Sequence, residues 1–255
     1  MKLSVTTFNI VKDWDLPFLL KKCRELGICG VEFRLNRNHA HGVELGLSKE
    51  KRREIREQVE DAYLTVVGVG ADSRFDKADE AELKVQVEDA KASIELCADL
   101  GGKYVRVYGN DINPALGREK AIRQVGACLA EVIPYGRRYG VEALIEMHGD
   151  FNYWGFVNRA LDASGVPDAG LIYNSDPRDV VCGSIAQVYS LIKNRIKLVH
   201  LHDFTGGFPY MELLQLLKDD GYDGYVSAEL AASDDGEKVL AYFAETYRLM
   251  LKNLK

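Results

Sequence analysis

Long apolar runs are missing from this sequence. No stretch approaches the roughly 20 consecutive apolar residues that a membrane-spanning helix needs. The first residues, MKLSVTTF, turn polar too early for the apolar core of a secretion signal. We therefore expect a cytoplasmic protein with no membrane partner.

Cysteine is scarce, and no two cysteines have the C-x-x-C spacing of zinc ribbons and redox motifs. The total of five is odd, and most of them lie in apolar stretches: Cys23, Cys29, Cys97, Cys128 and Cys182. We predict that they are reduced residues of the core, as is usual for cytoplasmic proteins.

A surplus of positive charge is also absent. Asp and Glu outnumber Lys and Arg by 39 to 33, which gives a formal net charge of −6. A dedicated nucleic-acid-binding protein needs a basic face that neutralises phosphates, so we expect no nucleic-acid partner. Low-complexity tracts and Pro/Ser-rich linkers are missing as well, which predicts one domain over residues 1–255.

What the chain does contain is a regular alternation of short β-rich runs and longer amphipathic stretches. The eight predicted strands are 3–8, 30–34, 64–69, 104–108, 143–146, 170–174, 196–201 and 225–229. Each precedes a predicted helix, at 16–26, 49–62, 80–100, 119–139, 153–164, 185–192, 210–218 and 238–251. Of the six prolines only Pro134 falls inside a predicted helix, where we expect a kink or an early break. Eight such units in about 250 residues predict a single (β/α)8 TIM barrel.

Polar residues gather where the predicted strands end, which is where parallel barrels carry their active sites. All five histidines lie at the end of a predicted strand or in the loop after it: His39, His41, His148, His200 and His202. Residues two apart on a strand point the same way, which predicts three same-side pairs: Glu146 with His148, Asn174 with Asp176, and His200 with His202. Glu229 ends the last strand beside them.

Carboxylates and imidazoles that converge from neighbouring strands form a mixed oxygen and nitrogen site. Such a site suits one divalent metal ion, Mn²⁺, Mg²⁺, Co²⁺ or Zn²⁺. Without a metal, the buried charges of Glu146 and Glu229 would repel each other, and at least one of the two carboxylates would take up a proton. The alternative for each residue alone is a hydrogen-bonded structural role.

Several further side chains are candidates for substrate binding. Arg34 and Arg106 end two strands, where a cation could hold a hydroxyl, carboxylate or phosphate group or pair with a neighbouring carboxylate. The indole of Trp154 could stack on a sugar ring, or pack at the start of its helix. For His39 and its neighbour His41 the alternatives are contact with substrate and simple solvation in a loop.

Five segments resemble the xylose isomerase-like TIM barrels, a broad family of sugar phosphate isomerases and epimerases. They are residues 27–34 together with 101–106 (GICGVEFR and GGKYVR), 143–148 (ALIEMH), 197–203 (KLVHLHD) and 222–229 (YDGYVSAE). The resemblance covers nearly the whole chain. It implies that Glu146, His200 and Glu229 are metal ligands, with both glutamates also acting as acid/base groups.

The chain departs from the family's pattern at two positions. Members usually place an Asp, the fourth metal ligand, at the end of strand six, where this chain has Asn174. Three alternatives follow: Asn174 is the fourth ligand, Asp176 takes its place, or the substrate binds to the same groups without a metal. His202 stands where many relatives have Lys. We predict substrate contacts for His202 and His148.

The resemblance implies a metal-dependent isomerase or epimerase of a sugar or sugar phosphate. Glu146 and Glu229 would exchange protons with the substrate through an enediolate. A keto-sugar lyase or dehydratase on the same site, and a metal-free sugar-binding barrel without catalysis, are the alternatives. A small-molecule sugar is the expected partner, with a homodimer also considered. An apurinic-site endonuclease would need more histidine and acidic ligands for its three zinc ions and is disfavoured.

Overall fold

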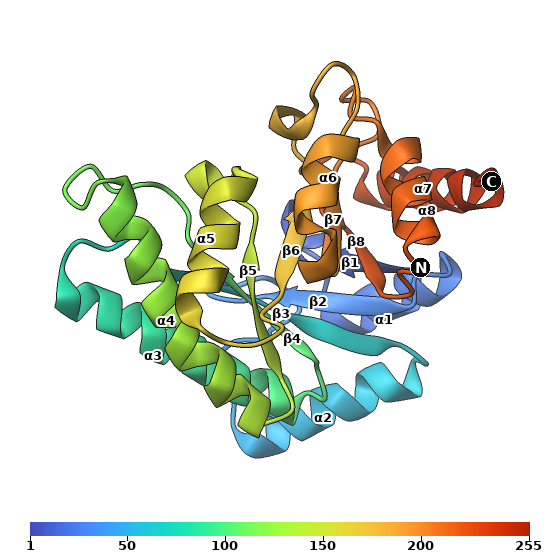
Figure 1. Ribbon diagram of the computed structural model, residues 1–255. Helices are drawn as coiled ribbons and strands as arrows, with labels where there is room; N and C mark the ends of the chain where they lie inside the picture. Colours follow the sequence, from blue (N-terminus) through green and yellow to red (C-terminus); the bar gives the residue numbers. More distant parts are fainter.

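The computed structural model describes residues 1–255 and forms a closed barrel of parallel strands in sequential order, with β8 pairing with β1. The strands are β1 (Lys2–Thr6), β2 (Gly30–Arg34), β3 (Thr65–Arg74), β4 (Tyr104–Tyr108), β5 (Glu142–Glu146), β6 (Leu171–Asn174), β7 (Ile196–Leu201) and β8 (Tyr225–Ala228). Figure 1 shows them at the centre of the molecule, with the helices on the outside. The predicted (β/α)8 barrel is confirmed.

Eight α-helices follow the strands in turn. They are α1 (Leu16–Glu25), α2 (Lys49–Asp61), α3 (Glu80–Asp99), α4 (Arg118–Arg138), α5 (Trp154–Ser164), α6 (Ala186–Ile192), α7 (Tyr210–Asp219) and α8 (Gly236–Lys252). Four short 3₁₀ helices lie in the connections: η1 (Asn9–Val11), η2 (Gly149–Asn152), η3 (Pro177–Asp179) and η4 (Lys193–Arg195). No helix has both the length and the apolar character required to cross a membrane.

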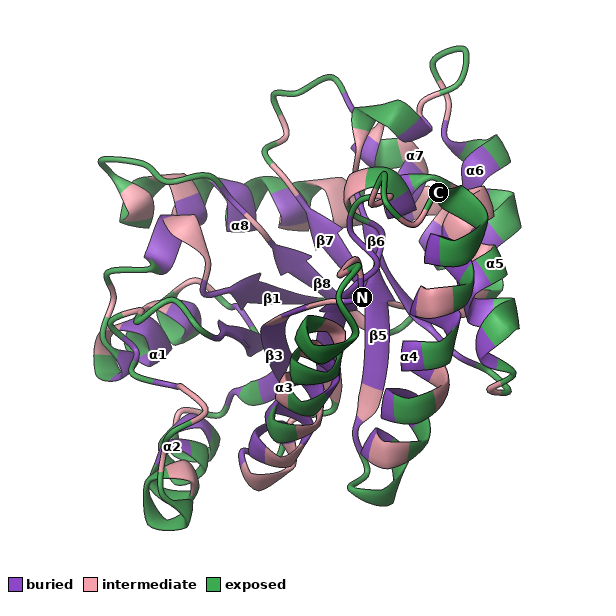
Figure 2. Ribbon diagram, turned by 90° about the vertical axis from the view of Figure 1, so that its left-hand side faces the viewer, coloured by how far each residue is buried: buried purple, intermediate pink, exposed green.

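The helices bury one side against the strands and expose the other. In α3 the side chains of Val87, Ala90, Ile94 and Cys97, which follow one another at steps of three or four residues, are buried. The Asp79 side chain accepts a hydrogen bond from the backbone N–H of Glu82 and caps the start of this helix. Figure 2 shows the same division, with buried strands and helices that are buried on one side and exposed on the other.

Two elements differ from the prediction. Strand β3 runs to Arg74, five residues beyond the predicted end, because after an irregularity that follows Gly70 it pairs with β4 again, with Arg74 opposite Tyr108. Helix α4 does not break early at Pro134 but continues to Arg138. Buried residues on both sides of Pro134, among them Ile133 and Gly136, hold this part of the helix against its neighbours.

The cysteine prediction is correct for three residues and wrong for two. Cys23, Cys97 and Cys128 are buried and free, as expected. Cys29 and Cys182 are exposed. Cys29 lies in the connection just before β2, and Cys182 has a positive φ of 51° in a tight turn, so neither belongs to the apolar face of an element. For these two cysteines, the location in a connection between elements determines the exposure of the side chain, and its apolar character does not.

The interior of the barrel is filled by an apolar layer beneath a polar one. Val67, Leu144, Ile172 and Leu198 form a small buried cluster that is separate from the main core between strands and helices. Leu144, Ile172 and Leu198 lie on β5, β6 and β7. Two positions further along the same strands are Glu146, Asn174 and His200. Because alternate residues of a strand face the same side, these polar side chains lie on the inner face directly above the apolar layer.

Strands β3 and β4 approach each other closely at Gly68. A Cβ atom on Gly68 would lie 2.1 Å from the carbonyl oxygen of Tyr104, far inside van der Waals contact. We expect Gly68→Ala to lower the unfolding free energy by about 3 kcal/mol and the melting temperature by roughly 6–12 °C. Gly46→Ala is the control, because a Cβ there meets nothing within 4 Å. Equal melting temperatures of the two variants in a thermal unfolding scan would contradict the close approach of β3 and β4 at Gly68.

Candidate active site

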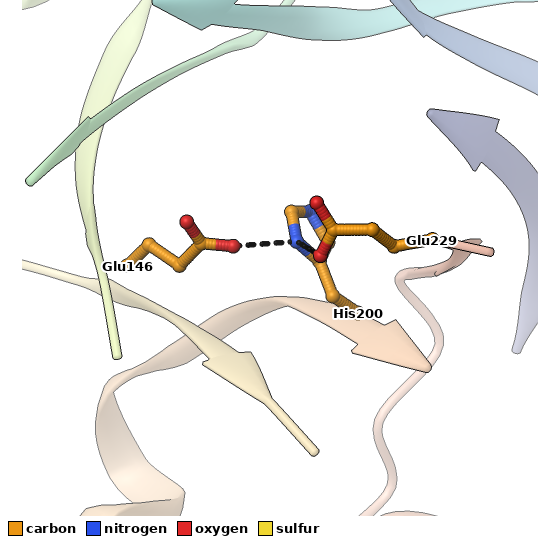
Figure 3. A group of neighbouring side chains, drawn as sticks. All are labelled: Glu146, His200 and Glu229. Atoms are coloured by element: carbon orange, nitrogen blue, oxygen red, sulfur yellow. Dashed lines mark hydrogen bonds and ion pairs between the residues drawn. The ribbon is translucent and has the colours of Figure 1, made fainter. Parts of the chain in front are cut away.

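Three predicted ligands meet at the mouth of the barrel. Glu146 ends β5, His200 lies near the end of β7 and Glu229 follows the last residue of β8. His200 Nδ1 lies 2.8 Å from Glu146 Oε1 and 3.3 Å from Glu229 Oε2. Each residue offers a ligand atom, and these atoms lie within 4.8 Å of one another. In Figure 3 both carboxylates point toward the imidazole ring.

A third carboxylate at this centre was not predicted. Glu32 on β2 is buried, and its Oε2 lies 3.0 Å from His200 Nε2. Ser227 Oγ donates to the same Glu32 oxygen at 3.3 Å, and Ser4 Oγ lies 2.6 Å from Ser227 Oγ. The sequence contained a signal for Glu32, because it forms a same-side pair with Arg34 like the pairs on the other strands.

The charges of this group balance through His200 and Arg106. Burial opposes the charged form of His200, but Glu32, Glu146 and Glu229 together raise its pKa well above the usual value. Arg106 Nη1 lies 3.5 Å from Glu146 Oε2 and 3.6 Å from Glu229 Oε1. Two cationic side chains therefore stand among three carboxylates in a buried space.

Glu229 is not the carboxylate that takes up the expected proton. Burial would raise its pKa, but hydrogen bonding to His200 and the charges of His200 and Arg106 lower that pKa to about 2. The prediction considered only repulsion between Glu146 and Glu229. It left out the two cations that face them, so the sign of the effect on Glu229 was reversed.

The three-residue group is chemically suited to a divalent cation. Two carboxylates and one imidazole are ligand types that transition metals and Mg²⁺ accept. Glu146 Oε2 is buried and has no hydrogen-bond partner, so this oxygen is free to bind a cation. The residues present therefore fit one divalent metal ion.

Asn174 and Asp176, the candidates for a fourth ligand, have polar partners of their own. Asn174 Oδ1 lies 2.6 Å from His202 Nε2, and the other ring nitrogen of His202 lies 3.0 Å from the backbone oxygen of Glu229. Arg178 binds both oxygens of Asp176, at 3.0 Å and 2.7 Å. Although burial opposes ionisation, these contacts lower the pKa of Asp176. Asp176 is not one of the clustered ligands, and the amide oxygen of Asn174 is in contact with His202.

A cavity of about 570 Å³ opens above the three ligands, with Glu146 and Glu229 in its wall. Four of the seven candidate substrate-binding residues also line it: Arg34, Arg106, His148 and His202. Its volume lies within the range of about 300–1,000 Å³ that is usual for small-molecule sites. The cavity therefore joins the candidate ligands to side chains that can bind hydroxyl or anionic groups.

The other predicted substrate-binding residues lie elsewhere. Trp154 is the first residue of α5 and packs at 5.2 Å from the ring of Tyr153, outside the cavity lining. His39 lines a separate surface depression. His41 is buried beside Thr7 Oγ1 at 2.9 Å, and burial lowers its pKa to about 3, which indicates a structural residue. Loop conformation, which spacing does not reveal, decides these positions.

A model of the xylose isomerase-like TIM barrels matches residues 20–250, which is most of the chain. The chain belongs to this family. The resemblance found in its strand-end segments is thereby confirmed. No curated protein matches the sequence significantly.

Solved structures also resemble this xylose isomerase-like barrel. A 3-keto-D-glucoside 4-epimerase from E. coli is 15% identical, with 99% of each chain covered and a TM-score of 0.79. An L-ribulose 3-epimerase is 17% identical over 99% of this chain and 95% of its own, with a TM-score of 0.81. The IOLI protein with a zinc atom is 19% identical over 98% of this chain and 96% of its own, with a TM-score of 0.77. At such identities the likeness establishes a shared fold.

One wall of the cavity is formed by the connections after β5 and β6. Arg178 Nη1 donates to the backbone oxygen of Gly149 at 2.9 Å. Asn152 Nδ2 donates to Asp179 Oδ1 at 3.2 Å. Burial raises the pKa of Asp179 to about 7, and the nearby charge of Asp176 contributes to the increase. The two connections are thus held together by contacts that include the carboxyl group of Asp179, whose pKa is raised.

We expect Asp179→Asn to change how stability depends on pH. Since the folded pKa of about 7 exceeds the ordinary 3.8, the stabilisation from protonated Asp179 is complete below about pH 4 and is lost as the pH rises through 7. Asp179→Asn should match the wild type near pH 4 and be more stable at pH 8, by up to about 4 kcal/mol. Urea unfolding at both pH values measures this difference. A variant less stable than wild type at pH 8 would contradict it.

Proposed function

We propose that this chain is a divalent-metal-dependent isomerase or epimerase of sugars. The observation that carries the proposal is the convergence of Glu146, His200 and Glu229, whose ligand atoms lie within 4.8 Å of one another at the mouth of the barrel. The likeness in fold to several sugar epimerases and to a zinc-containing protein supports the same class. A bound ion would polarise the carbonyl and hydroxyl oxygens of a ketose and acidify the neighbouring C–H bond.

His200 Nδ1 is the nitrogen suited to metal binding, because it faces both Glu146 and Glu229. A histidine that binds a metal through one nitrogen usually donates a hydrogen bond from the other. Glu32 provides the acceptor for that second nitrogen, at 3.0 Å. Glu32 would therefore keep the proton on Nε2 and leave the lone pair of Nδ1 directed at the metal.

Glu146 and Glu229 are the groups that would move protons. They come from β5 and β8 and reach His200 from different strands. If one removes a proton from a substrate carbon and the other returns a proton to the opposite face, the product is an epimer. Return of the proton to the adjacent carbon of the enediolate gives aldose–ketose isomerisation instead. Arg106, in contact with both carboxylates, would orient them and favour the ionised form of Glu229.

Substitution of either glutamate tests the reaction. Glu146→Gln and Glu229→Gln should each reduce turnover by about 10²–10⁴-fold, because a carboxamide cannot exchange protons at neutral pH. The measurement is deuterium uptake from D₂O into a panel of ketoses, which reports proton removal whichever product forms. The exposed Glu54→Gln on α2 is the matched control. Deuterium uptake at the wild-type rate in both cavity variants would rule out this mechanism.

Substitution of Glu32 tests how the metal is held. We expect Glu32→Gln to weaken Mn²⁺ or Co²⁺ binding by about 10–100-fold, as is typical when the hydrogen-bond partner of a ligand histidine is altered. Isothermal titration calorimetry on metal-depleted protein measures the change. An unchanged dissociation constant in a folded Glu32→Gln variant would mean that Glu32 does not position His200.

A metal-free sugar-binding barrel is the second candidate, favoured by the position of Asn174. Its amide oxygen is directed at His202 rather than at the other ligands. This alternative predicts protein that contains no metal when purified without chelator. It also predicts stabilisation by sugars that EDTA leaves unchanged. Stoichiometric metal in the purified protein would exclude it.

A further inference from the structure

Arginine side chains are concentrated in the wall of the active-site cavity. Five of its lining residues are arginines and three are acidic: Arg34, Arg37, Arg74, Arg106 and Arg178 against Glu146, Asp176 and Glu229. The chain as a whole carries a net charge of −6, so the positive excess is local. Arg106 contacts the two catalytic glutamates and Arg178 is paired with Asp176. The remaining three arginines need a separate explanation.

Those three arginines converge on a single carboxylate. Arg34 Nη2 lies 2.5 Å from Asp72 Oδ1, Arg37 Nη2 lies 2.7 Å from Asp72 Oδ2, and Arg74 Nη2 lies 3.9 Å from Asp72 Oδ1. Three positive charges against one negative charge leave an excess of two. Arg34 is only 5% exposed, and its Nε has no hydrogen-bond partner. A buried guanidinium group with an unsatisfied N–H is costly unless an anion completes its contacts.

The three arginines lie next to the candidate catalytic residues. Gly70 on β3 pairs with Arg34 on one side and with Arg106 on the other. A Cβ atom on Gly70 would lie 3.0 Å from Arg106 Nη2 and 3.4 Å from Arg34 Cδ, so both side chains pass over this glycine. Arg106 in turn contacts Glu146 and Glu229. One small molecule could therefore reach from the two glutamates to the three arginines.

We propose that the substrate is an anionic sugar whose carboxylate or phosphate group binds to Arg34, Arg37 and Arg74, with its reacting carbons at Glu146 and Glu229. Guanidinium groups match both anions through paired N–H donors. The assignment of reacting carbons rests on the proposed function, whereas the anion site depends only on the arginines. A neutral sugar would leave the excess of positive charge uncompensated.

Anion binding by the full-length protein tests this proposal directly. Isothermal titration with inorganic phosphate and with glycolate is carried out in EDTA at constant ionic strength, with chloride as the balancing ion. Arg37→Gln and Arg74→Gln are the variants of choice, because these side chains are 42% and 39% exposed and their loss should not unfold the barrel. Each should weaken binding of the preferred anion about tenfold. Arg53→Gln on the outside of α2 is the matched control and should bind as the wild type does.

The anion that binds more tightly identifies the substrate class. A preference for phosphate indicates a sugar phosphate, and a preference for glycolate indicates a sugar acid. Wild-type protein that binds neither anion, or a double variant that binds as the wild type does, overturns the proposal. Because the titration contains no metal, intact anion binding without turnover would refute only the proposed function. Turnover of neutral ketoses without anion binding would refute only the present inference.

Discussion

The contact of His200 with three carboxylates is the interaction on which the active-site geometry depends. Glu32, Glu146 and Glu229 come from β2, β5 and β8, and only the closed barrel brings these strands to one axis. Three buried carboxylates would repel one another strongly without compensating charge. The imidazole between them and Arg106 beside them supply that compensation. The same arrangement leaves Glu146 Oε2 without a hydrogen bond, and this oxygen gives the group its capacity for a cation.

The sequence was sufficient for the fold and for the centre of the site because both depend on simple periodicities. Alternation of strands and helices predicts the barrel, and the two-residue repeat of a strand places Glu146 and His200 on its inner face. Glu32 was missed because its partner His200 lies across the barrel, a relation that appears only on closure. Trp154 and His39 depend on loop conformation, and Asp176 on its pairing with Arg178. Such contacts have no periodic signature in the chain.

The cavity combines two kinds of electrostatic environment. Around His200, positive and negative groups are interleaved and nearly balance, which suits proton transfer between fixed positions. Around Asp72, positive charge is in excess. The two regions meet at Gly70, where the side chains of Arg106 and Arg34 both pass over the backbone. A larger residue at this position would displace Arg106 or Arg34. The chemistry and the recognition of substrate charge thus occupy adjoining parts of one cavity.

The apolar layer of Val67, Leu144, Ile172 and Leu198 determines how molecules enter and leave the active site. It seals the barrel beneath the polar residues, so whatever reaches His200 must arrive and depart through the same opening. An incoming molecule cannot push the previous one out at the far end. The connections that surround the opening therefore govern both arrival and departure, and any residue that narrows it slows the two steps together.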